Sequence, residues 1–239
     1  MKIFNRFIII ASIATMFPAA ARAAGPAGAG LRAAVGALEQ GYDSLTDMQA
    51  EFKQTTFIAS MKRQERGAGD VSIKKAPGAM AMFRFDYTTP RQQIISNGKK
   101  VWYYLPENKQ VMVSDVKGMF EGSRGIALNY LTGMGHISRD FSISFTDGGR
   151  DKKGNYLLEL IPKKPTRVLT KLILTVQRAD VEQYENNGKV GAAFPVVSSV
   201  VFDSFGNRTT IEFSKIRVNR GISSTRFNFR IPAGTEIMR

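Results

Sequence analysis

The stretch FRFDYTTPRQQIISNGKKVWYYLPENKQV, residues 83–111, decides the fold class because turn-forming residues divide its short apolar runs. Ser96-Asn97-Gly98 and Pro106-Glu107-Asn108 stand between those runs, and Asn-Gly in such a position is typical of a tight β-hairpin. The stretch therefore predicts short antiparallel strands that follow one another in sequence order.

The same pattern continues over most of the chain. In several segments apolar residues occupy every second position, which is typical of β-strands. These are Ala50 and Phe52; Phe141, Ile143 and Phe145; Leu172, Leu174 and Val176; Ile211 and Phe213; and Phe227 and Phe229. No linker or internal repeat divides the series. We expect a mainly β protein with a few helices (α+β), built as one antiparallel meander curled into a barrel or half-barrel.

Two segments favour helices. The apolar residues from Leu31 to Tyr42 recur at spacings of four, three and four, which places them on one helix face. Residues 123–131 lie between Gly122 and Gly133 and carry the apolar residues Ile126, Ala127, Leu128, Tyr130 and Leu131, which predicts a short helix inserted into the meander.

The N-terminus is typical of a secretory signal peptide. Lys2 and Arg6 precede the apolar stretch Phe7–Met16, and Ala21-Arg22-Ala23 has the small-x-small pattern of a cleavage site. A membrane-spanning helix needs about 20 apolar residues, which this stretch lacks. The expected division is a signal peptide over 1–23, a flexible linker over 24–30 and a single soluble domain over 31–239.

The composition of the 239 residues argues against catalysis. The chain has no cysteine and one histidine, His136, which excludes disulfides, thiolate nucleophiles and sites built on several histidines. No nucleotide-binding or serine-hydrolase motif occurs. Arg84 and Asp86 share one strand face, where an ion pair that stabilises the fold is favoured over a catalytic acid. We therefore expect no enzyme, no cofactor and no metal site.

The formal net charge of +14 indicates anionic partners. In a cell envelope these are lipid headgroups and lipopolysaccharide, and we expect no nucleic acid partner. Simple binding to polyanions is an alternative hypothesis. Its basic pairs, Lys99-Lys100, Lys152-Lys153 and Lys163-Lys164, fall in expected turns, where solvated surface charge is the simpler interpretation.

One apolar face of a long sheet needs a cover, and two short helices cover only part of it. The remainder is either a packed core or a cavity for an apolar guest. Several methionines accompany the aromatic residues of the central stretch: Met80, Met82, Met112, Met119 and Met134. Methionine adapts to irregular apolar partners, so this composition is compatible with both interpretations.

Three segments, in this order, resemble the LolA family of periplasmic lipoprotein carriers. They are LTDMQAEFKQ at 45–54, the stretch at 83–111, and RFNFRIPAGTEI at 226–237. The resemblance implies an incomplete, strongly curved antiparallel β-barrel with helices as a lid over an apolar cavity.

The resemblance also implies a role. A carrier of this kind takes acylated lipoproteins from an inner-membrane ABC transporter complex, shields their acyl chains and delivers them to an outer-membrane lipoprotein acceptor. We therefore expect a monomeric periplasmic protein that binds acylated lipoproteins or lipids. Transport of free lipid or glycolipid on the same fold is the alternative.

Site residues follow from the resemblance and from strand alternation. The expected cavity residues are Phe52, Met80, Met82, Phe83, Phe85, Trp102, Tyr104 and Met112, and the expected lid residues are Ile126, Leu128 and Leu131. The family has an arginine before a proline that holds the lid closed, whereas this chain reads Lys74-Lys75-Ala76-Pro77. Lys75 is the expected latch, and as a point charge it would hold less specifically than arginine.

Overall fold

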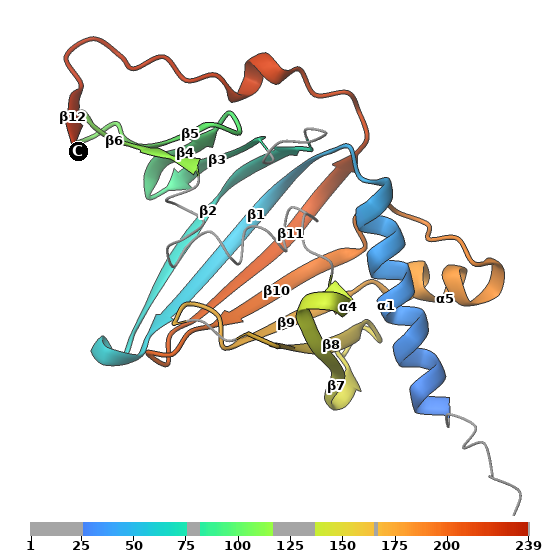
Figure 1. Cartoon of the computed structure of the whole chain (residues 1–239). Coiled ribbons are helices and arrows are strands. Elements are labelled where there is room, and N and C mark those ends of the chain that lie inside the picture. Colours follow the sequence, from blue (N-terminus) through green and yellow to red (C-terminus); the bar gives the residue numbers. More distant parts are fainter. Residues whose placement is uncertain (1–25, 76–81, 117–136, 165–166, 239) are drawn as a thin grey trace, which may run out of the picture.

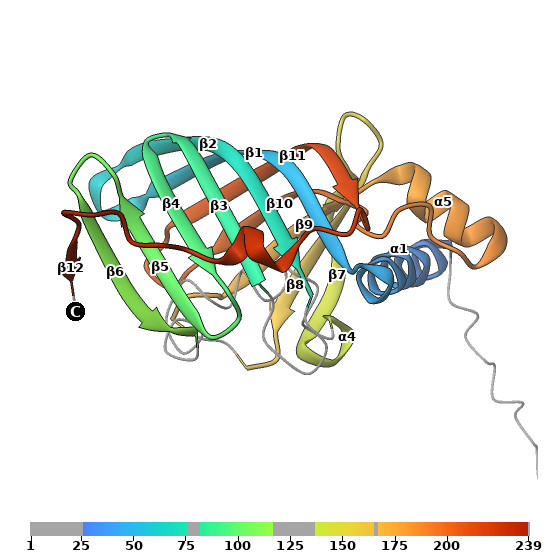
Figure 2. The same cartoon turned by 90° about the horizontal axis from the view of Figure 1, so that it is seen from above.

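The structure, a computed structural model, describes residues 26–75, 82–116, 137–164 and 167–238. Within these ranges the strands form one 12-stranded sheet with the order β12-β6-β5-β4-β3-β2-β1-β11-β10-β9-β8-β7. Neighbouring strands are antiparallel except for β12 and β6, which are parallel. Figures 1 and 2 show an open, curved sheet, as the alternation and the turns predicted. The single meander that we expected is wrong, because the sheet consists of two meanders, β1–β6 and β7–β11, joined by the pairing of β1 with β11.

The strands are β1 (Asp47–Ile58), β2 (Arg63–Lys74), β3 (Met82–Thr89), β4 (Arg91–Ser96), β5 (Lys100–Leu105), β6 (Gln110–Asp115), β7 (Phe141–Arg150), β8 (Tyr156–Pro162), β9 (Lys171–Val176), β10 (Val196–Phe202), β11 (Arg208–Val218) and β12 (Glu236–Met238). The helical elements are α1 (Pro26–Ser44), α4 (Ile137–Asp140), α5 (Arg178–Asn187) and the 3-10 turns η1 (Ala59–Met61) and η2 (Ser224–Phe227).

Helix α1 confirms the helix predicted from the spacing between Leu31 and Tyr42. It begins earlier than expected, at Pro26, so residues 26–30 belong to its first turns and not to a flexible linker. The reason is that proline is well tolerated at the first helical position and alanine has the highest helix propensity, which outweighs the glycines here. The expected signal peptide (1–23) and the expected helix over 123–131 lie outside the described residues.

No helix among the described residues is long and apolar enough to cross a membrane.

The main hydrophobic core lies on the inner, concave face of the sheet. Along β3, Phe83 and Phe85 point to this face and are buried, while Arg84 and Asp86 point to the outer face. Alanines and Leu38 of α1 join the same core, so the helix covers the end of the sheet where β1 begins (Figure 1).

A second, smaller apolar cluster lies on the outer face. After β11 the chain runs across β3 to β6 and ends as β12 beside β6 (Figure 2). We call residues 219–238 the C-terminal strap. Phe227 of the strap is fully buried, and so are Ile95 of β4 and Val111 of β6 on the face it crosses. The alternation of Phe227 with Phe229 predicted a strand, but the structure has the turn η2 followed by irregular chain.

The buried carboxylate of Asp47 holds the start of the strap. Asp47 is 3% exposed and accepts hydrogen bonds from the backbone N–H groups of Arg220 and Gly221, both at 2.9 Å. Since Asp47 is the first residue of β1, this contact connects the strap to the strand that follows α1 in the chain.

Candidate functional site

The centre of the inner face is an aromatic cluster on β1 and β3. The ring of Phe52 lies 5.5 Å from that of Phe85 and 4.8 Å from that of Tyr87, both edge-to-face. Phe83 continues the cluster, 6.2 Å from Phe85. Phe52, Phe83 and Phe85 are at most 6% exposed. Three of the expected cavity residues therefore meet on one apolar surface.

A glycine in β2 makes this meeting possible. Gly69 lies between Phe52 of β1 and Tyr87 of β3 in the strand register. A Cβ atom at this position would stand 2.0 Å from the carbonyl oxygen of Asp86, so no other residue fits without moving the backbone. Without a side chain on the intervening strand, the rings of β1 and β3 touch across it.

The apolar surface extends from the aromatic cluster to the other half of the sheet. Its further members are fully or nearly fully buried aliphatic and aromatic side chains: Val71, Ile73, Phe141, Leu158, Leu160, Leu172, Leu174 and Phe213. They form one continuous cluster with those of α1. Such a surface offers hydrocarbon a large contact area, and in this structure it is closed.

Lys75, the expected latch, contacts α1. Its ammonium group donates a hydrogen bond to the carbonyl oxygen of Tyr42, near the end of α1, and its backbone N–H donates to Thr46 at 2.9 Å. Burial lowers the pKa of Lys75, and the nearby carboxylate of Asp43 opposes that shift. The contact therefore joins the end of β2 to the last turn of α1 through a partly desolvated charge.

The adjacent Lys74 makes a similar contact on the other side of the sheet. Its ammonium group donates to the carbonyl oxygen of Ile222 in the C-terminal strap at 2.5 Å. The two consecutive lysines thus hold the two segments that cover opposite faces of the sheet, α1 and the strap. Lys75 and Lys74 have the same chemistry but different partners.

Trp102 and Tyr104 were expected in the cavity, and this expectation is wrong. They lie on the outer face, where their rings are 6.1 Å and 5.4 Å from the ring of Phe229 in the strap. Met82 shares the outer face with Arg84 by strand alternation. The physical reason is that the strap gives the outer face of β5 its own apolar cover, so alternation alone does not indicate which face is inner.

Of the remaining expected cavity and lid residues, the structure describes only Met112. Met112 of β6 pairs with Tyr103 on the inner face, next to the edge strand β12, and is 39% exposed. Met80, Ile126, Leu128 and Leu131 lie outside the described residues.

The expected ion pair between Arg84 and Asp86 is confirmed. The guanidinium Nε lies 2.8 Å from the carboxylate, which also accepts a hydrogen bond from the amide of Gln93 at 2.7 Å. The structure thus shows the carboxylate of Asp86 on the outer face with both an ion pair and a hydrogen bond. The single histidine, His136, lies outside the described residues.

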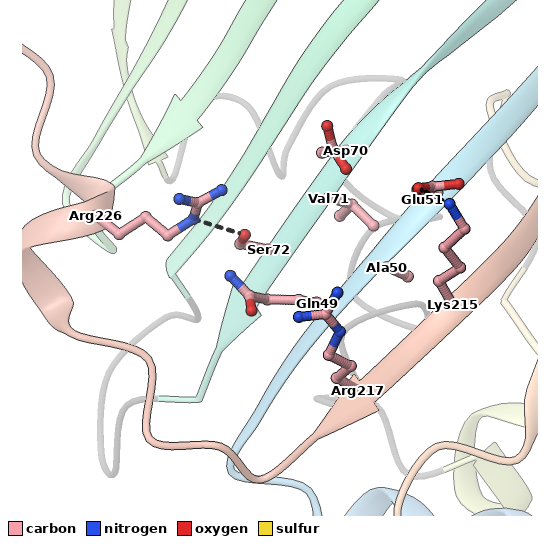
Figure 3. A pocket seen from close by; sticks show the side chains of 9 residues that line it. All are labelled: Gln49, Ala50, Glu51, Asp70, Val71, Ser72, Lys215, Arg217 and Arg226. Carbon is pink, nitrogen blue, oxygen red and sulfur yellow. Dashed lines mark hydrogen bonds and ion pairs between the residues drawn. The ribbon is translucent and has the colours of Figure 1, made fainter.

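The outer face carries a polar pocket of about 180 Å³ beside the strap (Figure 3). Its charged side chains come from β1, β2, β11 and η2, and include a pair of Lys215 with Glu51 at 2.7 Å and a hydrogen bond from Arg226 to Ser72 at 2.8 Å. The lining contains both charges and little apolar surface, so it does not suit an acyl chain. Among the described residues no group of three or more acidic or histidine side chains could hold a metal ion.

Comparison with known proteins identifies the family. The family described as "Outer membrane lipoprotein carrier protein LolA" matches residues 43–230. The chain belongs to the LolA family. A relative named outer-membrane lipoprotein carrier protein from Methylobacillus flagellatus is 27% identical, over 98% of both chains. One of the same name from Pseudomonas aeruginosa PAO1 is 28% identical, over 95% of this chain and 98% of its own.

A crystal structure of a LolA superfamily protein from Nitrosomonas europaea superposes with a TM-score of 0.42 and 12% identity, covering 83% of this chain and 97% of its own. A likeness of this size carries no argument of its own.

Sequence reasoning missed the strap contacts and the outer pocket of this LolA-family chain. The pocket combines residues 49–72 with residues 215–226, which follow more than 140 positions later, and a β-bulge between Gln49 and Glu51 sets their register. No local pattern marks such a site. The partner of Lys75 was missed for the same reason, because Tyr42 lies 33 positions earlier in the chain and comes close to Lys75 only in the folded protein.

Proposed function

We propose that this protein is a periplasmic carrier that shields the acyl chains of lipoproteins on its inner face. The observation that carries the proposal is the continuous apolar surface of the inner face, centred on Phe52, Phe83 and Phe85, in a chain of the LolA family. Burial of hydrocarbon contributes about 0.8 kcal/mol per CH₂ group, so a long acyl chain supplies ample free energy for binding.

In this proposal the protein has no enzymatic activity. It is exported with the help of residues 1–23, acts as a monomer and exchanges its cargo between an inner-membrane ABC transporter complex and an outer-membrane lipoprotein acceptor. Relatives that are named outer-membrane lipoprotein carrier proteins over nearly their full length support this role.

The closed inner face sets a condition for the mechanism. Because the aromatic cluster is almost fully buried, a guest reaches it only after a covering segment moves. Lys75 holds α1 by one hydrogen bond from a partly desolvated ammonium group, which makes that end of the inner face a candidate for opening. Part of the binding free energy is then used to open the protein, which keeps the cargo releasable.

The test is a comparison of two matched aromatic variants. Phe85→Ser removes an aromatic ring from the inner face, and Tyr104→Ser removes one from the outer face under the strap. The proposal predicts that Phe85→Ser weakens binding of a synthetic triacylated lipopeptide at least tenfold, since a buried phenyl ring contributes about 2 kcal/mol, whereas Tyr104→Ser leaves it unchanged. Thermal unfolding checks that both variants fold.

Native mass spectrometry of the protein from its own periplasm, prepared without detergent, identifies the cargo. A bound acylated lipoprotein supports the proposal. A bound free phospholipid or glycolipid instead supports the alternative carrier function on the same inner face. Equal lipopeptide binding by both variants contradicts the inner face as the site.

A further inference from the structure

A row of polar side chains crosses the inner face beyond the aromatic cluster. Its members are partly exposed and come from β11, β1, β3, β4 and β5: Thr209, Thr56, Gln54, Tyr87, Gln92 and Tyr103. We call them the polar row. Strand alternation places them on the same face as Phe52 and Phe85, at the end of the sheet away from α1 (Figure 1).

Hydrogen bonds connect the members of the polar row. Tyr87 donates its hydroxyl to the amide oxygen of Gln54 at 2.8 Å, and the amide nitrogen of Gln54 donates to Thr56 at 3.2 Å. The hydroxyl groups of Thr56 and Thr209 lie 3.2 Å apart. At the other end, Tyr103 donates to the amide oxygen of Gln92 at 2.6 Å. Tyr87 and Gln92 are directly paired in the register, which joins the two halves.

Gly67 of β2 allows the row to cross that strand. A Cβ atom at Gly67 would lie 3.0 Å from the ring of Tyr87, so the ring lies over the glycine and reaches Gln54 on β1. The amide groups of Gln54 and Gln92 use their oxygens within the row. An amide nitrogen carries two hydrogens, so each glutamine keeps at least one N–H to donate to a ligand oxygen.

The position of the polar row divides the inner face into two parts. From Gln54 to Met48 the β1 strand rises about 20 Å, and its inner residues on that side, Phe52, Ala50 and Met48, are buried. One leaflet of a bilayer is about 15 Å of hydrocarbon. The buried part is therefore as long as an acyl chain in a membrane, with hydrogen-bond donors at one end of it.

Ser199 of β10 is a second observation that points to a ligand. It is 0% exposed, and its hydroxyl has no hydrogen-bond partner. In the register it pairs with Ile211, which in turn pairs with Gln54, so Ser199 lies at the height of the polar row. A buried hydroxyl without a partner is unfavourable, and a carbonyl oxygen of a ligand would relieve it.

We propose that the polar row binds the ester carbonyl groups of a diacylglyceryl unit and so fixes how deep its acyl chains enter. The proposal rests on the function proposed above and adds the part of the ligand that this end of the face recognises. Ester carbonyls are acceptors only, which matches the remaining amide and hydroxyl donors of Gln54, Gln92 and Ser199. Lipoproteins and phospholipids both contain this unit.

The test replaces donors of the row by apolar groups of similar size. The variant is Gln54→Leu with Thr56→Val. The control is Thr55→Val with Thr210→Val, which removes two hydroxyl groups from the outer face of the same strands, where these residues are paired. Isothermal titration measures binding of a triacylated lipopeptide, of its dialkyl ether analogue, which lacks the ester carbonyls, and of phosphatidylglycerol.

The row variant should bind the ester lipopeptide about tenfold more weakly, as expected for the loss of one or two hydrogen bonds. Its affinity for the ether analogue should equal that of the unaltered protein, and the control should match the unaltered protein for both probes. The same tenfold loss for phosphatidylglycerol assigns the shared glycerol unit as the ligand, and a loss for the lipopeptide alone assigns the lipoprotein.

Two results overturn the proposal. Equal losses for the ester and ether probes mean that the variant acts through the packing of the sheet and not through carbonyl groups. Unchanged binding of all probes means that the row contacts no ligand, while the carrier function stands. If the unaltered protein binds no acylated probe, the carrier function and the polar row proposal fall together.

Discussion

Replacing Lys75 by methionine tests whether α1 is the segment that moves. The ammonium group of Lys75 donates to the carbonyl oxygen of Tyr42, and a hydrogen bond from a charged donor contributes about 1.5–3 kcal/mol. Burial of the charge, seen in the lowered pKa of Lys75, offsets part of this gain. We expect Lys75→Met to lower the free energy of unfolding by about 1 kcal/mol, measured by urea denaturation.

The same change should raise the affinity for cargo. If α1 must leave the inner face before a guest enters, weakening the closed state by about 1 kcal/mol raises the population of the open state, and thus the apparent affinity, about fivefold. Titration with a triacylated lipopeptide measures this. Lys75→Arg keeps a charged donor and should leave stability and affinity near those of the unaltered protein.

Lys99→Met is the matched control, because Lys99 is exposed and only its backbone takes part in hydrogen bonds. It should change neither quantity. A loss of stability in Lys75→Met without a gain in affinity would refute the reasoning, because α1 would then be a fixed part of the fold. Unchanged stability would show that the contact with Tyr42 contributes nothing.

Four further substitutions test other parts of the structure. Phe229→Ala should lower the unfolding free energy by about 2 kcal/mol through lost contacts with Trp102 and Tyr104, and leave lipopeptide affinity unchanged, since these rings lie on the outer face. Gly69→Ala should destabilise the protein by more than about 2 kcal/mol, because its Cβ would lie 2.0 Å from a backbone oxygen. Gly30→Ala in α1, with open space around it, should stabilise the protein by about 0.5–1 kcal/mol. Thermal unfolding compares the two variants. Asp180 is buried at the start of α5, and burial raises its carboxyl pKa against the opposing hydrogen bond from Ala192. The folded state therefore holds this proton more tightly than the unfolded state, and the free energy of unfolding should rise as pH falls through the raised pKa toward 3.8. Asp180→Asn should remove this pH dependence, measured by urea denaturation between about pH 7 and pH 4, and raise stability at pH 7. An unchanged pH dependence would contradict the assignment to Asp180.

The strands and the pairing of consecutive strands could be predicted from the sequence because they depend on local signals. Turns such as Ser96-Asn97-Gly98 and the alternation around Phe141 are readable within ten residues, and within β1–β6 and within β7–β11 each strand pairs with the next. The pairing of β1 with β11, which joins these two meanders, has no local signal. Helix α1 was predicted from its apolar face, but its first turns were not, since an Ala- and Gly-rich segment resembles a linker until its packing is known.

The face to which each aromatic residue points could not be predicted. Phe83 of β3 and Trp102 of β5 belong to strands with the same alternation on either side of β4, yet one lies in the main core and the other under the strap. The difference arises because residues 219–238 return to the outer face of β3 to β6, a contact between segments more than 100 positions apart. Alternation defines two faces, and only the long-range cover decides which is inner.

The polar row was also beyond the reach of the sequence. Gln54 and Thr56 look like ordinary strand residues, and their partners Tyr87 and Thr209 come from other strands. The β-bulge between Gln49 and Glu51 shifts the register of β1 against β11, and a shift of one residue would turn every partner to the other face. Only the folded register brings the amides and hydroxyls together.

An amphipathic inner face offers a physical solution to the opposed demands on a carrier. A face that is apolar throughout would bind acyl chains strongly but would expose its whole area to water whenever it opened, at a cost that grows with that area. Here the part beyond Gln54 is already polar and partly exposed, so it adds little newly exposed apolar surface when α1 leaves the face. In the proposed mechanism the buried part between Gln54 and α1 supplies the affinity, and Lys75 controls access to it through its hydrogen bond to Tyr42. In this mechanism affinity and release depend on different residues of the same face, and substitutions at Gln54 and Lys75 should therefore change lipopeptide binding in opposite directions.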